Sequence, residues 1–382
     1  MKVWLVAGED SGDQLGAKLI RSLRELAPRP IEFGGVGGDA MAAEGFHSLF
    51  PLDDVAVMGY LPVLARLRTL LRRIRQTVAD IVAARPDVLV IIDSPGFTHA
   101  VAKRVRKAAP GIPIVDYVSP SVWAWRPWRA AGMRPFIDHV MALLPFEPEA
   151  HRRLNGPACT YVGHPLIERL SELRPDPGEI TLRERRPWQL VILPGSRRSE
   201  IERLMPVFGE ALKRVRAHLG PVEAVLPAVS RHRSLIERLS AAWDSPVDVV
   251  HGEQAKLEAF RRARAALAAS GTVTLELALS GVPMVVAYKV SRIEEAVARR
   301  LIQVPTIVLP NLILGENAMP EFIQAECTAE ALADALVPLV EGGEARSAQV
   351  QALERIDGLM RLSDGDQPSL SAARIVLASI EP

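Results

Sequence analysis

Residues 189–200 read Gln-Leu-Val-Ile-Leu-Pro-Gly-Ser-Arg-Arg-Ser-Glu, a continuous apolar run followed by a short polar loop. An unbroken run of Leu, Val and Ile is typical of a parallel strand that is covered by helices on both faces. The following residues, as far as His218, show apolar side chains at helical spacing. The stretch therefore predicts a strand, a loop at its carboxyl end and a helix.

The same alternation extends in both directions along the chain and predicts an α/β protein with two doubly wound parallel sheets. We expect two Rossmann-like, doubly wound parallel-sheet domains that face each other across a cleft. The boundaries follow from composition: residues 1–167 form the first domain, 168–187 a charged, proline-rich linker, and 188–361 the second domain. A terminal helix from about 362 to 382 can pack back on the first domain. In the first half the strands are expected at 3–7, 31–36, 88–92, 114–118, 139–143 and 160–162; in the second at 189–193, 223–226, 247–250, 265–268 and 284–287.

Composition excludes several classes of protein. Of 382 residues, 46 are Lys or Arg and 45 are Asp or Glu, so the net charge of +1 provides no global basic field for nucleic acid. The two cysteines, Cys159 and Cys327, cannot build a disulfide framework and lie in no metal-like cluster, which favours a reducing, cytoplasmic compartment. The longest weakly charged stretch, 265–288, is interrupted by Ser270-Gly271, Glu276 and a Gly-Val-Pro turn, so no segment is expected to cross a membrane.

One segment has the composition of a membrane-surface helix. Between Asp54 and Asp80 there is no acidic residue, while five arginines crowd together and five apolar residues recur at helical spacing. Two interpretations are open: a core-facing helix with a solvated basic face, or a basic amphipathic surface that meets anionic lipid. The arginines are Arg66, Arg68, Arg72, Arg73 and Arg75, and the apolar residues are Leu64, Leu67, Leu71, Ile74 and Val78.

Three loops of the first half carry candidate site residues. Loop 8–13 follows the first strand, and its acidic residues favour contacts with sugar hydroxyls. A turn capped by Ser11 or Asp13 would also explain this composition. The candidate residues of the loop are Glu9, Ser11, Gly12 and Asp13. Asp93 follows the strand 88–92, where it can serve as a general base or as a helix N-cap. Loop 119–129 gathers three of the six tryptophans beside arginines and predicts a site wall or a membrane-edge anchor, with Ser121 and Trp123 as candidates.

Loops of the second half predict a site for a nucleotide diphosphate. Gly195 and Ser196 offer close backbone N–H groups, and Arg197 or Arg198 offers a bidentate cation. Ser270-Gly271-Thr272 lies between a strand and a helix, a geometry suited to anions. Glu276, one turn further on, can accept hydrogen bonds from ribose hydroxyls or cap its own loop.

A competing motif is present at Gly35-Val36-Gly37-Gly38-Asp39-Ala40, which fits the dinucleotide pattern and is followed by Asp53 and Asp54. A nicotinamide-dependent oxidoreductase would use this loop. The motif is weak, because it follows the second strand of the sheet instead of the first.

Six motifs occur in one order along nearly the whole chain and resemble those of the lipid-A-disaccharide synthase family. They are Gly-Glu-Asp-Ser-Gly-Asp at 8–13, Tyr-Val-Ser-Pro-Ser-Val-Trp-Ala-Trp at 117–125, Leu-Leu-Pro-Phe-Glu at 143–147, Leu-Pro-Gly-Ser-Arg at 193–197, Ala-Ser-Gly-Thr at 269–272 and Leu-Pro-Asn-Leu at 309–312. The resemblance implies an inverting glycosyltransferase of GT-B fold, with two Rossmann-like domains. The second domain would hold most of the donor, and backbone near Gly252 would contact its uracil. The enzyme would join UDP-2,3-diacylglucosamine to 2,3-diacylglucosamine 1-phosphate (lipid X), with β(1→6) linkage and release of UDP.

The resemblance also implies a location and roles for single residues. The family's members act without a metal or other cofactor, as peripheral proteins at the cytoplasmic face of the Gram-negative inner membrane. Asp93 matches the family's proposed general base, and Arg197, Glu276 and Asn311 match residues important for the donor or for activity. The chain departs from the family at Gly96, where a second aspartate is common, and at Glu316, where an arginine often stands.

Two further classes of function stay open at this point. A UDP-sugar epimerase would share the fold and both donor loops without needing a lipid acceptor. A non-catalytic lipid-binding protein would bind vesicles and release no UDP. The sequence leaves the oligomeric state open.

Overall fold

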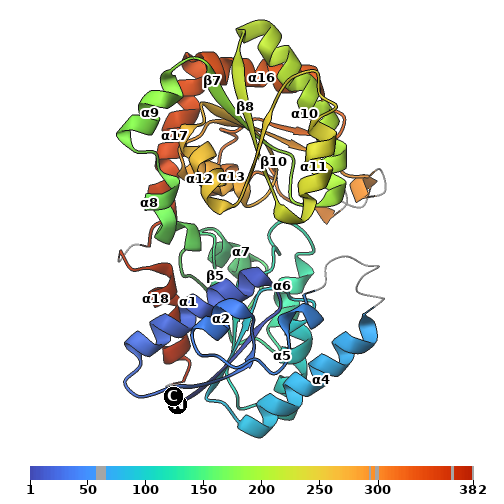
Figure 1. The fold of residues 1–382 in the computed structure, drawn as a ribbon. Helices are drawn as coiled ribbons and strands as arrows, with labels where there is room; N and C mark the ends of the chain where they lie inside the picture. The colour runs from blue at the N-terminus through green and yellow to red at the C-terminus, as the bar shows by residue number, and fades with distance from the viewer. Residues whose placement is uncertain (57–65, 292–293, 297–300, 363–364, 381–382) are drawn as a thin grey trace. The chain divides into compact units, whose positions relative to one another are not determined.

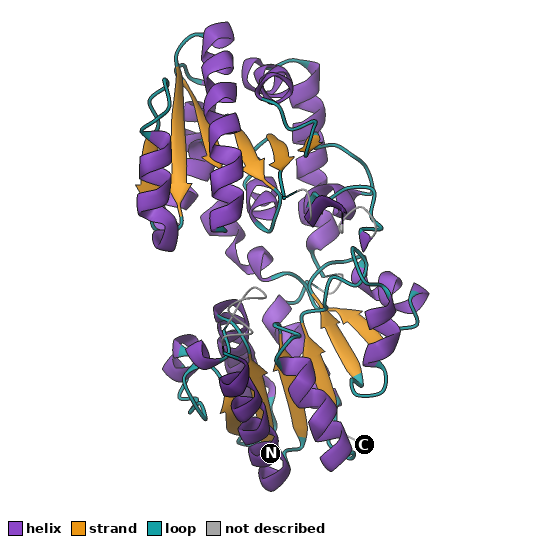
Figure 2. Cartoon of the chain, turned by 90° about the vertical axis from the view of Figure 1, so that its right-hand side faces the viewer, coloured by secondary structure: helices purple, strands orange, loops and turns teal. Residues whose placement is uncertain are grey.

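The computed structural model describes residues 1–56, 66–291, 294–296, 301–362 and 365–380. Within these residues the chain forms two parallel six-stranded sheets, with strand orders β2-β1-β3-β4-β5-β6 and β12-β11-β10-β7-β8-β9. Helices lie on both faces of each sheet (Figures 1 and 2). The predicted fold class, two doubly wound parallel-sheet α/β modules, is confirmed.

The chain divides into two compact units, and the first combines both ends of the sequence. Residues 1–167 and 361–382 form the first unit, and residues 168–360 form the second. The first unit contains β1 (Lys2–Ala7), α1 (Asp10–Leu26), β2 (Glu32–Val36), α2 (Asp39–Ala43), α4 (Leu67–Ala84), β3 (Val88–Ile92), α5 (Thr98–Ala108), β4 (Ile114–Tyr117), α6 (Trp128–Met133), β5 (His139–Ala142), α7 (Glu147–Arg153), β6 (Ala158–Tyr161) and α18 (Pro368–Ala378).

The core of the first unit shows why continuous apolar runs form its central strands. Val88, Val90 and Ile92 of β3 pack into one buried cluster with α1 and α18. Leu89 and Ile91 point to the opposite face and pack with α4 and α5. Because both faces are covered, every residue of β3 is buried.

The second unit repeats this arrangement. It contains α8 (Leu170–Leu173), α9 (Pro177–Glu184), β7 (Trp188–Leu193), α10 (Arg198–Leu219), β8 (Val222–Ala228), α11 (Arg233–Ser240), β9 (Asp248–His251), α12 (Glu253–Arg262), β10 (Ala265–Ala269), α13 (Val273–Leu279), β11 (Met284–Tyr288), α15 (Leu309–Leu314), β12 (Glu321–Ile323), α16 (Ala329–Glu341) and α17 (Glu344–Met360). Its largest buried cluster joins β7, β8 and β10 to α10 and α16.

The segment 168–187, expected to be a linker, instead folds as part of the second unit. Asp176 caps α9 with a side-chain hydrogen bond from the N–H of Glu179 at 2.8 Å. The guanidinium of Arg183 is buried and donates to the carbonyls of Phe260, Arg261, Ser280 and Gly281, so it ties α9 to two other helices of the unit. Its proline and charge made the segment resemble a linker, but Arg183 and Glu179 bind partners within the second unit.

Candidate active site

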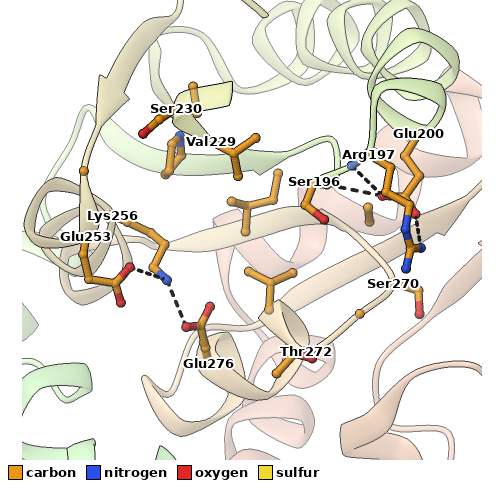
Figure 3. A pocket seen from close by; sticks show the side chains of 18 residues that line it. Ser196, Arg197, Glu200, Val229, Ser230, Glu253, Lys256, Ser270, Thr272 and Glu276 are labelled. Atoms are coloured by element: carbon orange, nitrogen blue, oxygen red, sulfur yellow. Dashed lines mark hydrogen bonds and ion pairs between the residues drawn. The ribbon is translucent and has the colours of Figure 1, made fainter. Parts of the chain in front are cut away.

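A pocket of about 550 Å³ lies in the second unit, at the carboxyl ends of β7, β8, β9 and β10. It brings together seven of the eight residues predicted to bind the donor: Ser196, Arg197, Gly252, Ser270, Gly271, Thr272 and Glu276 (Figure 3). The parallel register explains this convergence, because loops after neighbouring parallel strands leave the sheet at the same edge. The remaining lining residues are Leu193, Gly195, Glu200, Pro227, Ala228, Val229, Ser230, Glu253, Lys256, Ala269 and Val273.

Two backbone N–H groups of the loop before α10 already have hydrogen-bond acceptors within the protein, which the sequence does not predict. Oε2 of the buried Glu200 accepts from the backbone N–H groups of Ser196 at 3.3 Å and Arg197 at 3.2 Å. The N–H group of Ser196, which we expected to face a diphosphate, therefore already holds a carboxylate. Arg197 also donates to Oε1 of Glu200 at 2.8 Å, but its side chain is 63% exposed, so further guanidinium N–H groups can reach an anion.

The loop before α13 keeps its backbone donors available. Within the described residues, the N–H groups of Gly271 and Thr272 donate to no protein group. Gly271 has φ of +155°, and a Cβ there would meet no atom within 4 Å. The hydroxyl of Ser270 donates to the carbonyl of Ile307 at 2.7 Å and so fixes the loop. This loop is therefore the better candidate for binding phosphate oxygens through the backbone.

Glu276 lies in the pocket and forms an ion pair, which excludes the alternative that it caps its loop. Nζ of Lys256 lies 2.9 Å from Oε1 of Glu276 and 2.9 Å from Oε2 of Glu253. Lys256 was not predicted as a site residue, and neither were residues 227–230 at the carboxyl end of β8. Lys256 follows β9, so the rule that located the other loops at strand ends applies to both places.

Asn311 does not line the pocket, contrary to the expectation that it contacts the donor. Its side chain is buried: Nδ2 donates to the carbonyl of Met319 at 2.8 Å, and Oδ1 accepts from the N–H of Met319 at 2.9 Å. Both halves of the amide are thus used to hold the loop that follows α15. The short helix α15 has Pro310 in its first turn and is followed by Gly315 in the left-handed region.

In the first unit, Asp93 and Ser11 come together from two loops. The Ser11 hydroxyl donates to Oδ2 of Asp93 at 2.9 Å, and the N–H of Ser94 donates to Oδ1 at 2.7 Å. Asp93 has φ of +55°, and its own N–H donates to the carbonyl of Tyr117 at 2.9 Å. The first residue of α5 is Thr98 and its N-cap is Phe97, so Asp93 is no helix cap. Its carboxylate is half-buried and points out of the strand end toward loop 8–13.

Asp13 has a structural role in place of the predicted contact with substrate. Its buried carboxylate accepts from the N–H groups of Gly38 at 2.7 Å, Ala40 at 2.8 Å and Met41 at 3.1 Å. These groups form the start of α2, which is where the dinucleotide motif 35–40 would hold phosphate. Because Asp13 fills that position, the nicotinamide alternative loses its anion site.

The other candidates of loop 8–13 differ in exposure. Ser11 is exposed, Gly12 is buried, and Glu9 is half-buried at the N-cap position of α1, without a side-chain cap. A Cβ on Gly12 would lie 3.0 Å from the carbonyl oxygen of Ile92, so glycine here permits close packing of α1 on β3.

The tryptophan-rich loop after β4 is held in place by a hydrogen bond between Trp123 and the carboxylate of Glu147. Nε1 of Trp123 donates to Oε1 of Glu147 at 3.0 Å, and Oε2 accepts from the N–H groups of Leu143 at 3.1 Å and Leu144 at 3.0 Å. Burial raises the pKa of Glu147 to about 7, although the three hydrogen bonds lower it in part. Trp123 is therefore held by the protein, while Ser121 is exposed and Trp125 and Trp128 present their rings to solvent.

The basic helix α4 divides into an inner and an outer face. Arg73 is turned inward, with Nε 2.8 Å from Oδ2 of Asp54 and its guanidinium 4.5 Å from the centre of the Phe50 ring, so it is no membrane-facing residue. Arg66 donates to the carbonyl of Asp53 at 3.0 Å. Arg68, Arg72 and Arg75 are exposed, together with Leu67 and Leu71, whose exposed fractions are 44% and 38%. Ile74 and Val78 face the core, and Leu64 lies outside the described residues.

Solved structures with low sequence identity share this fold. UDP-GlcNAc 2-epimerase from Neisseria meningitidis, bound to UDP-GlcNAc, has a TM-score of 0.61 at 13% identity and covers 100% of this chain and 99% of its own. MurG from Acinetobacter baumannii has a TM-score of 0.59 at 15% identity, with 99% of both chains covered. The two sheets and the strand-end pocket place the chain in the class of GT-B-fold enzymes.

Sequence comparison identifies one family within this class of GT-B-fold enzymes. The family model of lipid-A-disaccharide synthetase matches residues 3–375. A lipid-A-disaccharide synthase from Nitrobacter hamburgensis is 50% identical over 379 residues, covering 99% of this chain and 96% of its own. One from Rhodopseudomonas palustris is 52% identical over 377 residues, covering 98% and 95%. The chain belongs to the lipid-A-disaccharide synthetase family, whose enzymes are glycosyltransferases that use a UDP-sugar. This membership disfavours the epimerase and the non-catalytic alternatives.

Proposed function

We propose that this enzyme transfers 2,3-diacylglucosamine from UDP to the 6-hydroxyl of lipid X and releases UDP. The observation that carries the proposal is the strand-end pocket of the second unit, where seven predicted donor residues converge in a chain about 50% identical to lipid-A-disaccharide synthases. No cofactor and no metal is part of this proposal.

The donor is proposed to bind through three sets of groups in the pocket. The N–H groups of Gly271 and Thr272 and the free N–H groups of Arg197 bind the diphosphate. Glu276 accepts from the ribose hydroxyls, and backbone at Gly252, whose φ of +89° leaves open space beside it, contacts uracil. The cations and backbone donors also stabilise the charge that develops on the departing diphosphate.

The reaction is proposed to be a single displacement with inversion. The carboxylate of Asp93 removes the proton from the 6-hydroxyl of lipid X as its oxygen attacks the anomeric carbon of the donor. The new glycosidic C–O bond forms as the bond to UDP breaks, and UDP leaves with the electron pair. Ser11 supports this role, because its hydroxyl holds one oxygen of Asp93 and leaves the remaining lone pairs of the carboxylate to accept.

Peripheral contact with the cytoplasmic face of the inner membrane completes the proposal. None of the helices in the described ranges is both long and apolar enough to cross a bilayer. Two features of the first unit support surface contact: the exposed leucines of α4 beside Arg68, Arg72 and Arg75, and the exposed rings of Trp125 and Trp128. α4 leads into the start of β3, so its N-terminal turns are expected toward the carboxyl ends of the strands, where Asp93 follows β3.

Replacing Arg68 and Arg72 together with serine should weaken binding to anionic liposomes, measured by sedimentation at low salt, by about thirtyfold, since each arginine near an anionic surface contributes about 1 kcal/mol. The matched control removes two exposed arginines of the second unit, Arg214 and Arg238, and should leave sedimentation unchanged. Equal effects of the two pairs would show that only net charge matters and would assign α4 no special contact with lipid.

The proposed reaction is tested by incubating the purified protein with UDP-2,3-diacylglucosamine and lipid X and analysing the products by mass spectrometry. We expect a disaccharide 1-phosphate and UDP in equal amounts, and the same turnover with EDTA present. UDP release without lipid X, or a change of the donor sugar alone, would contradict the proposal in favour of an epimerase-like reaction.

A further inference from the structure

The pocket contains a cation that none of the predicted donor contacts includes. Lys256 lies in the first turn of α12, and its side chain is 21% exposed. Nζ contacts Oε1 of Glu276 and Oε2 of Glu253, both at 2.9 Å, as the dashed lines of Figure 3 show. Burial alone would lower the pKa of Lys256, but the two carboxylates raise it above its ordinary value, so the ammonium stays charged.

The ion pair leaves Glu276 with one oxygen held and one available. In the described part of the chain, Oε2 of Glu276 has no hydrogen-bond partner, while Oε1 is bound to Lys256. A glutamate side chain has three rotatable bonds, and a bond to one oxygen restricts where the other can point. Glu253, on the far side of Lys256, is itself fixed by Nη2 of Arg169 at 3.0 Å. Lys256 therefore holds Glu276 in place and is itself held in place by Glu253.

We propose that Lys256 is a positioning residue for recognition of the ribose: it fixes the carboxylate of Glu276 so that the free oxygen accepts from the 2′-hydroxyl of UDP. This inference rests on the proposed donor site. Lys256 also offsets the charge of Glu276 and Glu253 in a pocket that receives a diphosphate, but that second effect applies equally to any nucleotide with the same phosphates.

The two effects separate when UDP is compared with 2′-deoxy-UDP, because the ligands carry the same charge and differ in one hydroxyl. Their dissociation constants are measured by calorimetry for the parent protein and for Lys256→Met, Lys256→Arg and Glu276→Gln. We expect Lys256→Met to lower the preference for UDP by about threefold to tenfold, the size of one hydrogen bond, and Lys256→Arg to restore it. In steady-state assays Lys256→Met should raise KM for the donor and leave kcat within about threefold.

The possible results distinguish a failure of the positioning role of Lys256 from a failure of the proposed donor site. If Glu276→Gln removes the preference for UDP and Lys256→Met does not, Lys256 has no positioning role and the donor site stands. If Lys256→Met weakens both ligands equally, its role is that of charge alone, which also overturns the inference. If the parent protein shows no preference for UDP, or Glu276→Gln keeps it, the ribose contact itself is wrong. Melting curves of all variants check the fold, and Lys256→Gln replaces Lys256→Met if the latter does not fold.

Discussion

Replacing Asp93 with asparagine is expected to lower turnover by about 10²–10⁴-fold, the usual contribution of a general base, while UDP binding stays intact. Asparagine has the shape of aspartate but cannot take the proton of the acceptor hydroxyl. It also tolerates the left-handed backbone at this position, where φ is +55°. The variant should therefore fold normally and lose only the chemistry.

Turnover is measured with both lipid substrates, and UDP affinity by calorimetry. The matched control is Ser11→Ala, which removes the hydrogen bond to Oδ2 of Asp93 and keeps the carboxylate. We expect this control to lose far less activity than Asp93→Asn. Near-normal turnover of Asp93→Asn would show that another group is the base, and loss of UDP binding would show that the substitution disturbs more than proton transfer.

The buried carboxyl of Glu147 is expected to make stability depend on pH. Burial raises its pKa from 4.5 to about 7, so between these values the folded protein binds more protons than the unfolded chain. Its contribution to stability is fully present below pH 4.5 and is lost as the pH rises to about 7. From pH 5 to pH 8, the free energy of unfolding should lose about 2–3 kcal/mol from this group alone.

The measurement compares urea unfolding of the parent protein with that of Glu147→Gln at both pH values. Glutamine does not titrate. The free energy of unfolding of the parent protein, relative to that of Glu147→Gln, should therefore fall by about 2–3 kcal/mol between pH 5 and pH 8. His151, whose pKa burial lowers to about 4, acts in the opposite direction, but it is present in both proteins and cancels. A difference that is the same at both pH values would mean that Glu147 titrates near its ordinary pKa in the folded state.

The sequence predicts most of this fold because its signals are local. Unbroken apolar runs such as 88–92 and 189–193 mark strands covered on both faces, and the loops after them reach one edge of the sheet by topology alone. That rule was enough to gather Arg197, Gly271 and Glu276 from separate parts of the chain into one pocket.

The errors concern where side chains point, which depends on residues far away in sequence. Asn311 faces Met319, and Arg73 faces Asp54 and Phe50, although both residue types suited an exposed role. Asp13 caps a helix that begins 26 residues later, which no local pattern near loop 8–13 indicates. Arg183 is similar: its four carbonyl partners lie about 80 to 100 residues further along the chain, so the segment 168–187 could not be recognised as folded from its own composition.

The return of α18 to the first unit has a consequence for biosynthesis. Ala372, Ala373 and Val376 of this helix belong to the same buried cluster as Leu19 and Leu23 of α1. Because α18 follows residues 168–360 along the chain, the first unit cannot complete its apolar interior until all of the second unit has been translated. A chain truncated after residue 360 should therefore contain a complete second unit and a first unit that lacks one helix of its buried core.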